Sequence, residues 1–445
     1  MTANRSKKKS FPARIWREVK LPFSRRFWDR QREKRMLGRM AGGAQHAALP
    51  ADLKTWQDVQ AKRAKVPVLA GIEKPIAMII DDRLPESDRD SGSLDAVNMI
   101  RSLINAGYHV IYAVQSDREQ EPRYTQALLD LGAVNLTKAD AASLNVFIER
   151  HGLHVDLFVL SRVSAGGKLF ELVRYNCLNA KIIFNTVDLH YIREARAAHL
   201  AGDQKASSQS ERTRAREEFL VAKSDMTLVV SSVENETLQA SVPGSNIAVV
   251  PLSREVRRPG ILFEKRGGIG FIGGFQHAPN VDAIRYFLST IWPLVHAKDP
   301  DIKFEIVGSD LPEDLLRNLP DQVDYLGILP EVESWFDTLR MTVAPLRIGA
   351  GAKGKIASSL CNGLPCVISS VAAEGMGFEH GDSVLVADSP EAMATEILRL
   401  HSDPALWGHL ASRAEEVSET QLSIRNFDTV MRETLVRMEL PICGR

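Results

Sequence analysis

Residues 341–368 read MTVAPLRIGAGAKGKIASSLCNGLPCVI. The apolar runs Met341–Ala344 and Cys366–Ile368 have the length of short buried strands, and the apolar residues of Ile356–Asn362 recur at helical spacing. A loop rich in glycine and basic residues joins the first run to the helix. Strand, helix and strand in this order are typical of a parallel sheet, whose neighbouring strands need a crossover connection.

The same alternation extends in both directions along the chain. Short runs rich in Val, Ile and Phe predict two series of strands, separated by segments of helical period. The first series comprises Ile76–Ile80, His109–Val114, Asp156–Leu160, Lys181–Phe184 and Met226–Val230. The second comprises Ile269–Ile272, Lys303–Val307, Val323–Tyr325, Met341–Ala344, Cys366–Ile368 and Val384–Val386. We therefore predict an α/β fold with two doubly wound, Rossmann-like domains that face each other across a cleft.

This pattern divides the chain into four segments. We predict a basic tail and linker over residues 1–73, a first domain over 74–260, a second domain over 261–420 and a terminal helix within 421–445. The boundary is placed near Ile261 because Ser253–Arg266 is rich in charged residues and has little periodicity. The segment Ile424–Met438 carries one apolar stripe, so we expect it to pack back towards the first domain.

The composition is that of a folded protein. Apolar residues make up 44% of the chain and charged residues 25%. No uncharged apolar run reaches about 18 residues, the length that a membrane-spanning helix needs. The 4 cysteines form no CxxC pair and have no histidine at ligand spacing, which argues against a structural zinc site. The sequence therefore predicts a protein of the reducing cytoplasm.

The net charge of +0 hides a strong asymmetry. Residues 1–40 hold 14 Lys and Arg against 3 Asp and Glu, interleaved with aromatic residues such as Trp16, Phe27 and Trp28. Aromatic rings insert at a lipid interface while basic side chains stay hydrated beside anionic headgroups, so the tail fits peripheral binding to an anionic membrane. A solvated basic tail fits the same composition, and RNA binding is a weaker interpretation.

The loop before Ile356 has the features of a phosphate site. Gly349 and Gly351 let the backbone approach an anion, and the helix N-terminus that follows presents unpaired N–H groups. Arg347 and Lys353 add fixed positive charge. The GxxxxGK[ST] spacing of a P-loop is missing, and glycine-rich loops also serve as packing turns. If the loop is functional, a diphosphate is the ligand that suits it.

Two further loops follow strands of the same domain. Gly273 and Gly274 form a turn that leads to His277 and Asn280, where Asn280 has the simpler interpretation of a helix cap. After Cys366–Ile368, Glu374 offers a carboxylate that can accept hydrogen bonds from sugar or ribose hydroxyls. Because the carboxyl ends of parallel strands share one edge of a sheet, we expect these loops to meet at the cleft.

In the first domain, Asp188 and His190 follow the strand Lys181–Phe184 and are expected at the cleft. A histidine near its usual pKa of about 6.5 can exchange protons or position a hydroxyl, and a neighbouring carboxylate would orient its ring. The alternative is an aspartate that caps a helix beside a surface histidine.

Together these motifs resemble one known family. Ile79–Pro85, Asp90–Ser93, Phe184–His190 and the three second-domain loops are similar to the GT-B glycosyltransferases of the large retaining group four, the glycosyl transferases group 1. The resemblance implies that Arg347 and Lys353 hold the diphosphate of a nucleotide-sugar and that the first domain presents the acceptor. The expected site comprises, on the donor side, Gly273, Gly274, His277, Asn280, Arg347, Gly349, Gly351, Lys353, Glu374, Gly375 and Met376; on the acceptor side, Asp90, Gly92 and Ser93; and as catalytic residues, Asp188, His190 and Lys353.

The resemblance implies a defined reaction. A sugar would pass from a nucleotide-diphosphate sugar to a glycan or lipid-linked acceptor, in polysaccharide assembly, with retention of configuration and without a metal, a cofactor or nucleic acid. Asp88–Asp90 matches a short acidic signature of metal-dependent GT-A enzymes, but the phosphate-type loops lie in the other domain, so we interpret it as a solvated turn.

One departure from the family pattern concerns two glutamates. Many members carry them where this chain has Ala350 and Ser358, and Glu374 would then take over part of their work. A catalytically silent scaffold that binds nucleotide-sugars, and a sugar-nucleotide epimerase or hydrolase, are the alternative functions.

Overall fold

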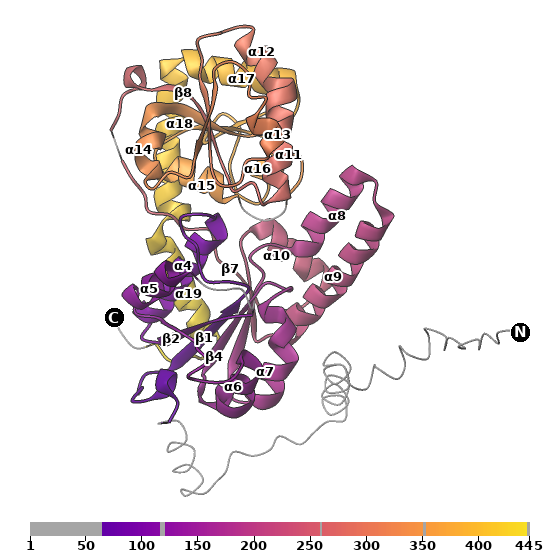
Figure 1. Ribbon diagram of the computed structural model, residues 1–445, viewed down its shortest axis with the longest axis vertical. Coiled ribbons are helices and arrows are strands. Elements are labelled where there is room, and N and C mark those ends of the chain that lie inside the picture. Colours follow the sequence, from indigo (N-terminus) through magenta and orange to yellow (C-terminus); the bar gives the residue numbers. More distant parts are fainter. Residues whose placement is uncertain (1–64, 116–120, 259, 350–352, 443–445) are drawn as a thin grey trace, which may run out of the picture.

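The structure is a computed structural model that describes residues 65–442 except 116–120, 259 and 350–352. It consists of two lobes, and each holds one parallel sheet with helices around it (Figure 1). The prediction of an α/β fold with two doubly wound domains is confirmed. The predicted basic tail lies almost entirely outside the described residues.

The first sheet has seven strands in the order β3-β2-β1-β4-β5-β6-β7. They are β1 (Ile76–Asp81), β2 (His109–Val114), β3 (Val134–Asn135), β4 (Leu157–Ser161), β5 (Lys181–Asn185), β6 (Met226–Val229) and β7 (Ile247–Val249). The five strands predicted for this domain are present. The two that the sequence did not predict, β3 and β7, are two and three residues long and form the edges of the sheet, so they are too short to show a periodic pattern.

The central strand β1 explains why the sheet is covered on both faces. Met78 and Ile80 lie in one apolar core, and Ala77 and Ile79 lie in another on the opposite face. Alternate side chains of a strand point to opposite faces, and both sets are apolar here, so each face needs helices to exclude water.

The first lobe contains seven α-helices among the described residues. They are α4 (Ser91–Asn105), α5 (Pro122–Asp130), α6 (Leu144–His151), α7 (Phe170–Asn176), α8 (His190–Ala201), α9 (Gln204–Lys223) and α10 (Ser232–Ser241). Gly202, with φ of 65°, ends α8 in the left-handed conformation, and Asp203 then caps α9. The chain reverses there, so α8 and α9 form a helical hairpin that projects from the lobe beside the junction (Figure 1).

The second sheet has the order β10-β9-β8-β11-β12-β13. Its strands are β8 (Gly267–Ile272), β9 (Phe304–Val307), β10 (Val323–Gly327), β11 (Leu339–Ala344), β12 (Cys366–Ile368) and β13 (Leu385–Val386), which confirms the predicted series. Its α-helices are α11 (Ala278–Tyr286), α12 (Trp292–His296), α13 (Glu313–Leu316), α14 (Val332–Thr338), α15 (Gly354–Cys361), α16 (Ser370–Ala373), α17 (Pro390–Ser402) and α18 (Pro404–Val417).

The last helix, α19 (Ile424–Arg437), runs from the second lobe onto the first (Figure 1). Its apolar stripe, which includes Phe427, Met431 and Leu435, is buried in the first-domain core that also holds residues of α4. Burial of each such side chain stabilises the packing of α19 on the first lobe by about 1.5–3 kcal/mol. Because α19 continues from the second lobe, this packing holds the two lobes next to each other.

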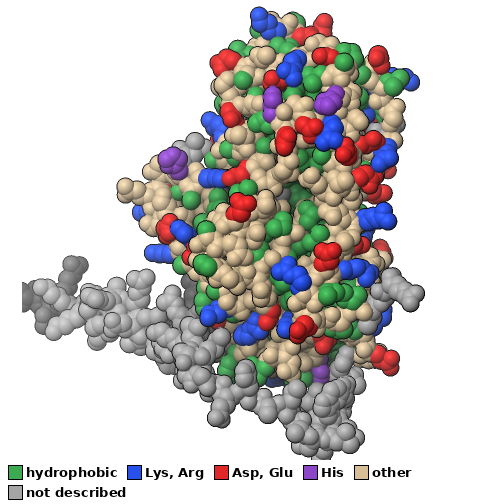
Figure 2. Space-filling view, turned by 180° about the vertical axis from the view of Figure 1, so that it is seen from behind, with side chains coloured by type: hydrophobic (Ala, Val, Ile, Leu, Met, Phe, Trp, Pro, Cys, Tyr) green, Lys and Arg blue, Asp and Glu red, His purple; other side chains and the backbone are tan. Residues whose placement is uncertain are grey.

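The described body presents a mixed surface. Figure 2 shows basic and acidic side chains interspersed over the back of both lobes. Within the described ranges, no helix combines the length and the apolar character that crossing a bilayer requires.

Candidate functional site

The loops that leave β1 and β11 meet where the lobes join. They lead into the N-termini of α4 and α15, and Gly354 at the start of α15 touches Ser91 at the start of α4. A Cβ atom on Gly354 would overlap the Ser91 hydroxyl and lie 2.8 Å from Nη2 of Arg254. Two helix N-termini, each with a partial positive charge, therefore converge from opposite lobes, and Asp90 caps that of α4.

Lys353 brings a buried cation to this junction. The residue directly precedes α15, is 8% exposed, and donates its backbone N–H to Sδ of Met376 at 3.2 Å. Burial lowers the pKa of Lys353 to about 8; Glu374 partly offsets this and Arg196 adds to it. The ammonium is therefore charged at neutral pH but costly to keep charged, which favours binding of an anion.

A second lysine braces the other glycine turn of the site. Nζ of Lys355 donates to Oδ1 of Asn280 at 2.5 Å, and Nδ2 of Asn280 donates to the carbonyl of Gly274 at 2.8 Å. A side chain on Gly273 would lie 2.7 Å from Nδ2 of Asn280, so this close approach requires glycine. Burial, then the charge of Lys353, lowers the pKa of Lys355 to about 7. The two predicted second-domain glycine loops are thus linked through Asn280.

His277, not Asn280, occupies the cap position of α11. The interpretation of Asn280 as a helix cap is therefore wrong, because its side chain binds the preceding turn. Burial is the first cause that lowers the pKa of His277, to about 4, and the charges of Arg193 and Lys355 lower it further. The residue nevertheless keeps an exposed surface. Arg193 belongs to the first domain, so its charge acts on His277 across the junction and favours the neutral ring.

Asp188 and His190 lie together at the start of α8. Oδ1 of Asp188 is 3.2 Å from Nε2 of His190, and Asp188 also pairs with Arg193. Burial would raise the pKa of Asp188, but the hydrogen bond from His190 and the charge of Arg193 outweigh it, so the pKa lies below its usual range. His190 is only 7% exposed. The alternative of a surface histidine beside a capping aspartate is therefore wrong.

Two buried glutamates, which no sequence motif singled out, hold this segment in place. Glu217 accepts the backbone N–H groups of His190 at 3.1 Å and Tyr191 at 3.0 Å. Glu234 accepts that of Leu189 at 3.1 Å. Burial is the main cause that raises their pKa values, to about 8 and about 7. They satisfy N–H groups at the helix start that would otherwise lie buried without partners.

Arg196 was also missed, although it follows Arg193 by three residues on the same face of α8. Its guanidinium reaches the second lobe, where it donates to both carboxylate oxygens of Glu374, at 2.6 and 2.8 Å, and to the carbonyl of Gly349 at 2.5 Å. The hydrogen bond from Arg196 is the main cause that lowers the pKa of Glu374. The predicted sugar-binding carboxylate is thus ionised and held from the opposite domain.

On the acceptor side, Asp90 has a structural role. It caps α4 by accepting from the backbone N of Ser93 at 2.8 Å and from its hydroxyl at 2.9 Å, and it pairs with Arg83 at 2.8 Å. Gly92 lines a recess in the first lobe together with Asp81, Asp95, Met99, Asn185 and Phe427. Asp90 therefore shapes the start of α4, beside the recess where Gly92 lies.

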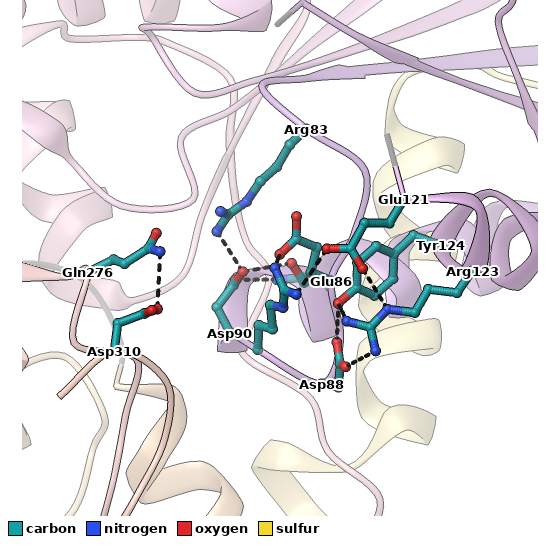
Figure 3. Close-up of polar contacts among 11 residues, drawn as sticks. Arg83, Glu86, Asp88, Asp90, Glu121, Arg123, Tyr124, Gln276 and Asp310 are labelled. Carbon is teal, nitrogen blue, oxygen red and sulfur yellow. Dashed lines mark hydrogen bonds and ion pairs between the residues drawn. The ribbon is translucent and has the colours of Figure 1, made fainter. Parts of the chain in front are cut away.

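The Asp88–Asp90 segment is braced by neighbouring side chains (Figure 3). Asp88 accepts from the hydroxyl of Tyr124 at 2.7 Å and pairs with Arg123 at 3.0 Å. Figure 3 also shows Gln276 and Asp310 of the second lobe, joined at 3.1 Å, across from this network. Within the described ranges, no group of three or more histidine, cysteine or acidic residues is arranged to hold a metal.

Arg347 does not share the buried position of Lys353. Its guanidinium binds Asp282 on α11, at 3.1 and 2.5 Å, and lies over the ring of Tyr286 at 4.6 Å. Its side chain is 44% exposed, and Asp282 already accepts from two of its nitrogen atoms. Ser358 accepts from Nε of Arg254 at 3.3 Å, whereas Ala350 and Gly351 lie outside the described residues.

Comparisons with known proteins agree with this architecture. The family described as glycosyl transferases group 1 matches residues 266–403, which include the second-domain loops described above. A relative from Klebsiella pneumoniae, described as an uncharacterized 44.6 kDa protein in the cps region, is 24% identical over 173 residues. That match covers 37% of this chain and 45% of the relative, so the chain matches less than half of that protein's length.

Solved structures resemble the chain over most of its length. Sucrose-phosphate synthase from Thermosynechococcus elongatus has a TM-score of 0.63 at 14% identity, covering 82% of this chain and 99% of that one. HepE from Anabaena, in complex with UDP and glucose, has a TM-score of 0.60 at 12% identity, covering 81% and 99%. The solved structures share the two-domain fold of this chain and the family model matches its second domain, so the chain resembles the GT-B glycosyltransferases of group 1, as its sequence motifs predicted.

Proposed function

We propose that this protein transfers a sugar from a nucleotide-diphosphate sugar to a glycan or lipid-linked acceptor, with retention of configuration and without a metal ion. The observation that carries the proposal is the position of Lys353. It is a buried cation directly before the N-terminus of α15, at the point where the two lobes meet. A leaving diphosphate needs positive charge at such a place.

The chemistry follows from the charge that develops. The bond from the anomeric carbon to the diphosphate oxygen breaks, the acceptor oxygen bonds to that carbon, and the acceptor proton leaves with the nucleotide diphosphate. Lys353 and the N–H groups that begin α15 would stabilise the departing oxygens. His190, oriented by ionised Asp188, would position a hydroxyl, and the contact of the lobes would exclude water that otherwise hydrolyses the donor.

The comparisons support a nucleotide-sugar as donor and a polysaccharide as product. The HepE structure contains UDP and glucose, and the Klebsiella relative is described by its place in a cps region. UDP-sugars are therefore the first donors to offer.

The test is mass spectrometry of products from a panel of nucleotide-sugars offered with membrane-lipid extracts. A product whose mass equals acceptor plus one sugar supports transfer. Donor consumed equally fast without acceptor would instead indicate a hydrolase or an epimerase. Binding of UDP without consumption of any donor would indicate a silent scaffold, the function that Ala350 and Ser358 favour.

Donor use should fall at alkaline pH. Lys353 can attract a diphosphate only while protonated, and burial lowers its pKa from 10.5 to about 8. We expect kcat/KM for the donor to be near its plateau below about pH 7 and to decline through about pH 8, well below an ordinary lysine. In Lys353→Arg the cation stays charged throughout, so the decline should vanish. A decline that persists there would assign it to another group, such as Lys355.

We propose in addition that the protein works at the cytoplasmic face of a membrane, bound through residues 1–40. The excess of basic residues in that tail, interleaved with aromatic ones, supports this. The full chain should sediment with vesicles that contain anionic lipid, and a chain starting at Ala41, which keeps the buried residues Val66, Val68 and Leu69, should stay in the supernatant. Equal binding of both chains would contradict a role for the tail. The same holds if the shortened chain still binds vesicles with anionic lipid and loses binding only to vesicles without it.

A further inference from the structure

Arg196 connects two loops of the donor site from the opposite domain. Glu374 follows α16 and Gly349 precedes α15, and the same guanidinium binds both, on three acceptor oxygens. The Arg196 and Glu374 side chains are each 33% exposed, so the pair lies at the edge of the junction and is partly shielded from water. A planar, two-pronged contact of this kind fixes the orientation of a carboxylate as well as its charge.

The loop that carries Glu374 meets the first lobe at a second point. Gly375 has φ of 74°, and a Cβ atom there would lie 2.7 Å from Cβ of Ser231, the cap of α10. The backbone of the loop thus packs against one helix start of the first lobe while its carboxylate is held by another helix, α8. Since the contacts come from two separate helices, the orientation of this loop depends on the first lobe being in place.

The charge of Arg196 also acts on Lys353. Arg196 lowers the pKa of Lys353 whereas Glu374 raises it, and Asp188 and Glu234 of the first lobe raise it as well. Lys355 is the other neighbouring cation. Arg196 therefore acts on the donor site in two ways: it holds the carboxylate of Glu374, and its charge opposes the charged form of Lys353.

We propose that Arg196 is a positioning residue of the donor site, supplied by the first domain, which sets Glu374 and the Gly349 loop in their donor-binding arrangement when the lobes are together. This inference rests on the proposed function and adds a consequence for donor binding. Donor hydroxyls would meet a correctly oriented Glu374 only in the closed molecule, so donor recognition and domain closure are coupled.

The experiment is a double-mutant cycle on the full chain. Arg196→Ala is expected to raise the donor KM about tenfold and to lower kcat, because a displaced carboxylate binds the sugar poorly. Arg196→Lys should recover part of the loss. In the Glu374→Ala background, Arg196→Ala should add less than about twofold, since two of its three acceptor oxygens are already absent and only the carbonyl of Gly349 remains. The matched control is Arg214→Ala on α9 of the same hairpin. Arg214 binds Glu218 at 2.8 Å and lies over the ring of Tyr191 at 5.8 Å, so both of these partners belong to the first lobe.

A pH profile tests the charge that Arg196 places near Lys353. Removal of Arg196 takes a positive charge away from Lys353, so the alkaline decline of kcat/KM should move to higher pH in Arg196→Ala. Arg196→Lys keeps the charge, so its decline should stay at the wild-type position.

Several outcomes would overturn the inference. The first is that Arg196→Ala has the same kinetics as Arg214→Ala, the second is that the losses in the double variant are additive, and the third is that the pH profile does not move. Each of these outcomes leaves the proposed function intact if the wild type transfers sugar. If the wild type transfers nothing, the proposed function fails, and the cycle is run on the dissociation constant of UDP-glucose by calorimetry. Additive effects on UDP-glucose binding, or no binding of UDP-glucose at all, would then reject the inference.

Discussion

Lys353→Ala is expected to reduce sugar transfer about 100-fold or more at neutral pH. The loss of one preorganised group that stabilises developing charge typically costs about 100- to 1000-fold in kcat. Lys353 is 8% exposed, beside a helix N-terminus, so water cannot readily take over its charge. The measurement is kcat with saturating acceptor and the donor that the product panel identifies.

Stability provides the control for this variant. Burial disfavours the charged form of Lys353, as its lowered pKa shows, so its removal should not destabilise the fold at neutral pH. Lys353→Ala should therefore unfold at no lower temperature than Lys298→Ala, which removes an exposed lysine of the same domain and should keep full activity. Near-normal turnover by a well-folded Lys353→Ala protein would reject a role for Lys353 in stabilising the leaving group.

The fold could be predicted because its signal is local. Strands such as β1 are apolar on both faces, and each series alternates with helices, so periodicity and order suffice to identify parallel sheets. The positions of the glycine loops follow from the same logic, since loops after parallel strands share one edge. The edge strands β3 and β7 could not be predicted, because two or three residues carry no period.

The partners of the charged residues could not be predicted in the same way. Arg196 and Glu374 lie 178 residues apart, and Arg347 and Asp282 lie 65 apart. The spacing of Arg193 and Arg196 places both on one helix face, but it does not say which lobe that face meets. Arg347 looked equivalent to Lys353 in the sequence, and only the packing on α11 separates an exposed paired cation from a buried one.

Gly354→Ala is expected to reduce kcat/KM about 100-fold or more while leaving both domains folded. The new Cβ atom would overlap the Ser91 hydroxyl and lie 2.5 Å from Cβ of Ser91, closer than carbon atoms of folded proteins approach. The lobes must separate to accommodate it, and a displacement of about 1 Å in a reacting complex can cost about 100-fold. Alanine is favoured over glycine in a helix, so α15 itself should not suffer.

The control uses a glycine of another helix, and the rescue acts at the contact itself. Gly408→Ala places the same extra methyl group on helix α18, where a Cβ atom meets no other atom within 4 Å, so it should leave transfer unchanged and stability equal or higher. Ser91→Gly removes two of the three atoms that the alanine strikes, and the third, Nη2 of Arg254 at 2.8 Å, ends a longer side chain that can shift. Ser91→Gly combined with Gly354→Ala should therefore recover part of the activity that Gly354→Ala loses. Small-angle scattering should show a more open molecule for the single variant than for the double one. If the double variant stays as inactive as Gly354→Ala, the loss does not arise from the meeting of the two helix starts, and closure at this point is not what the reaction requires.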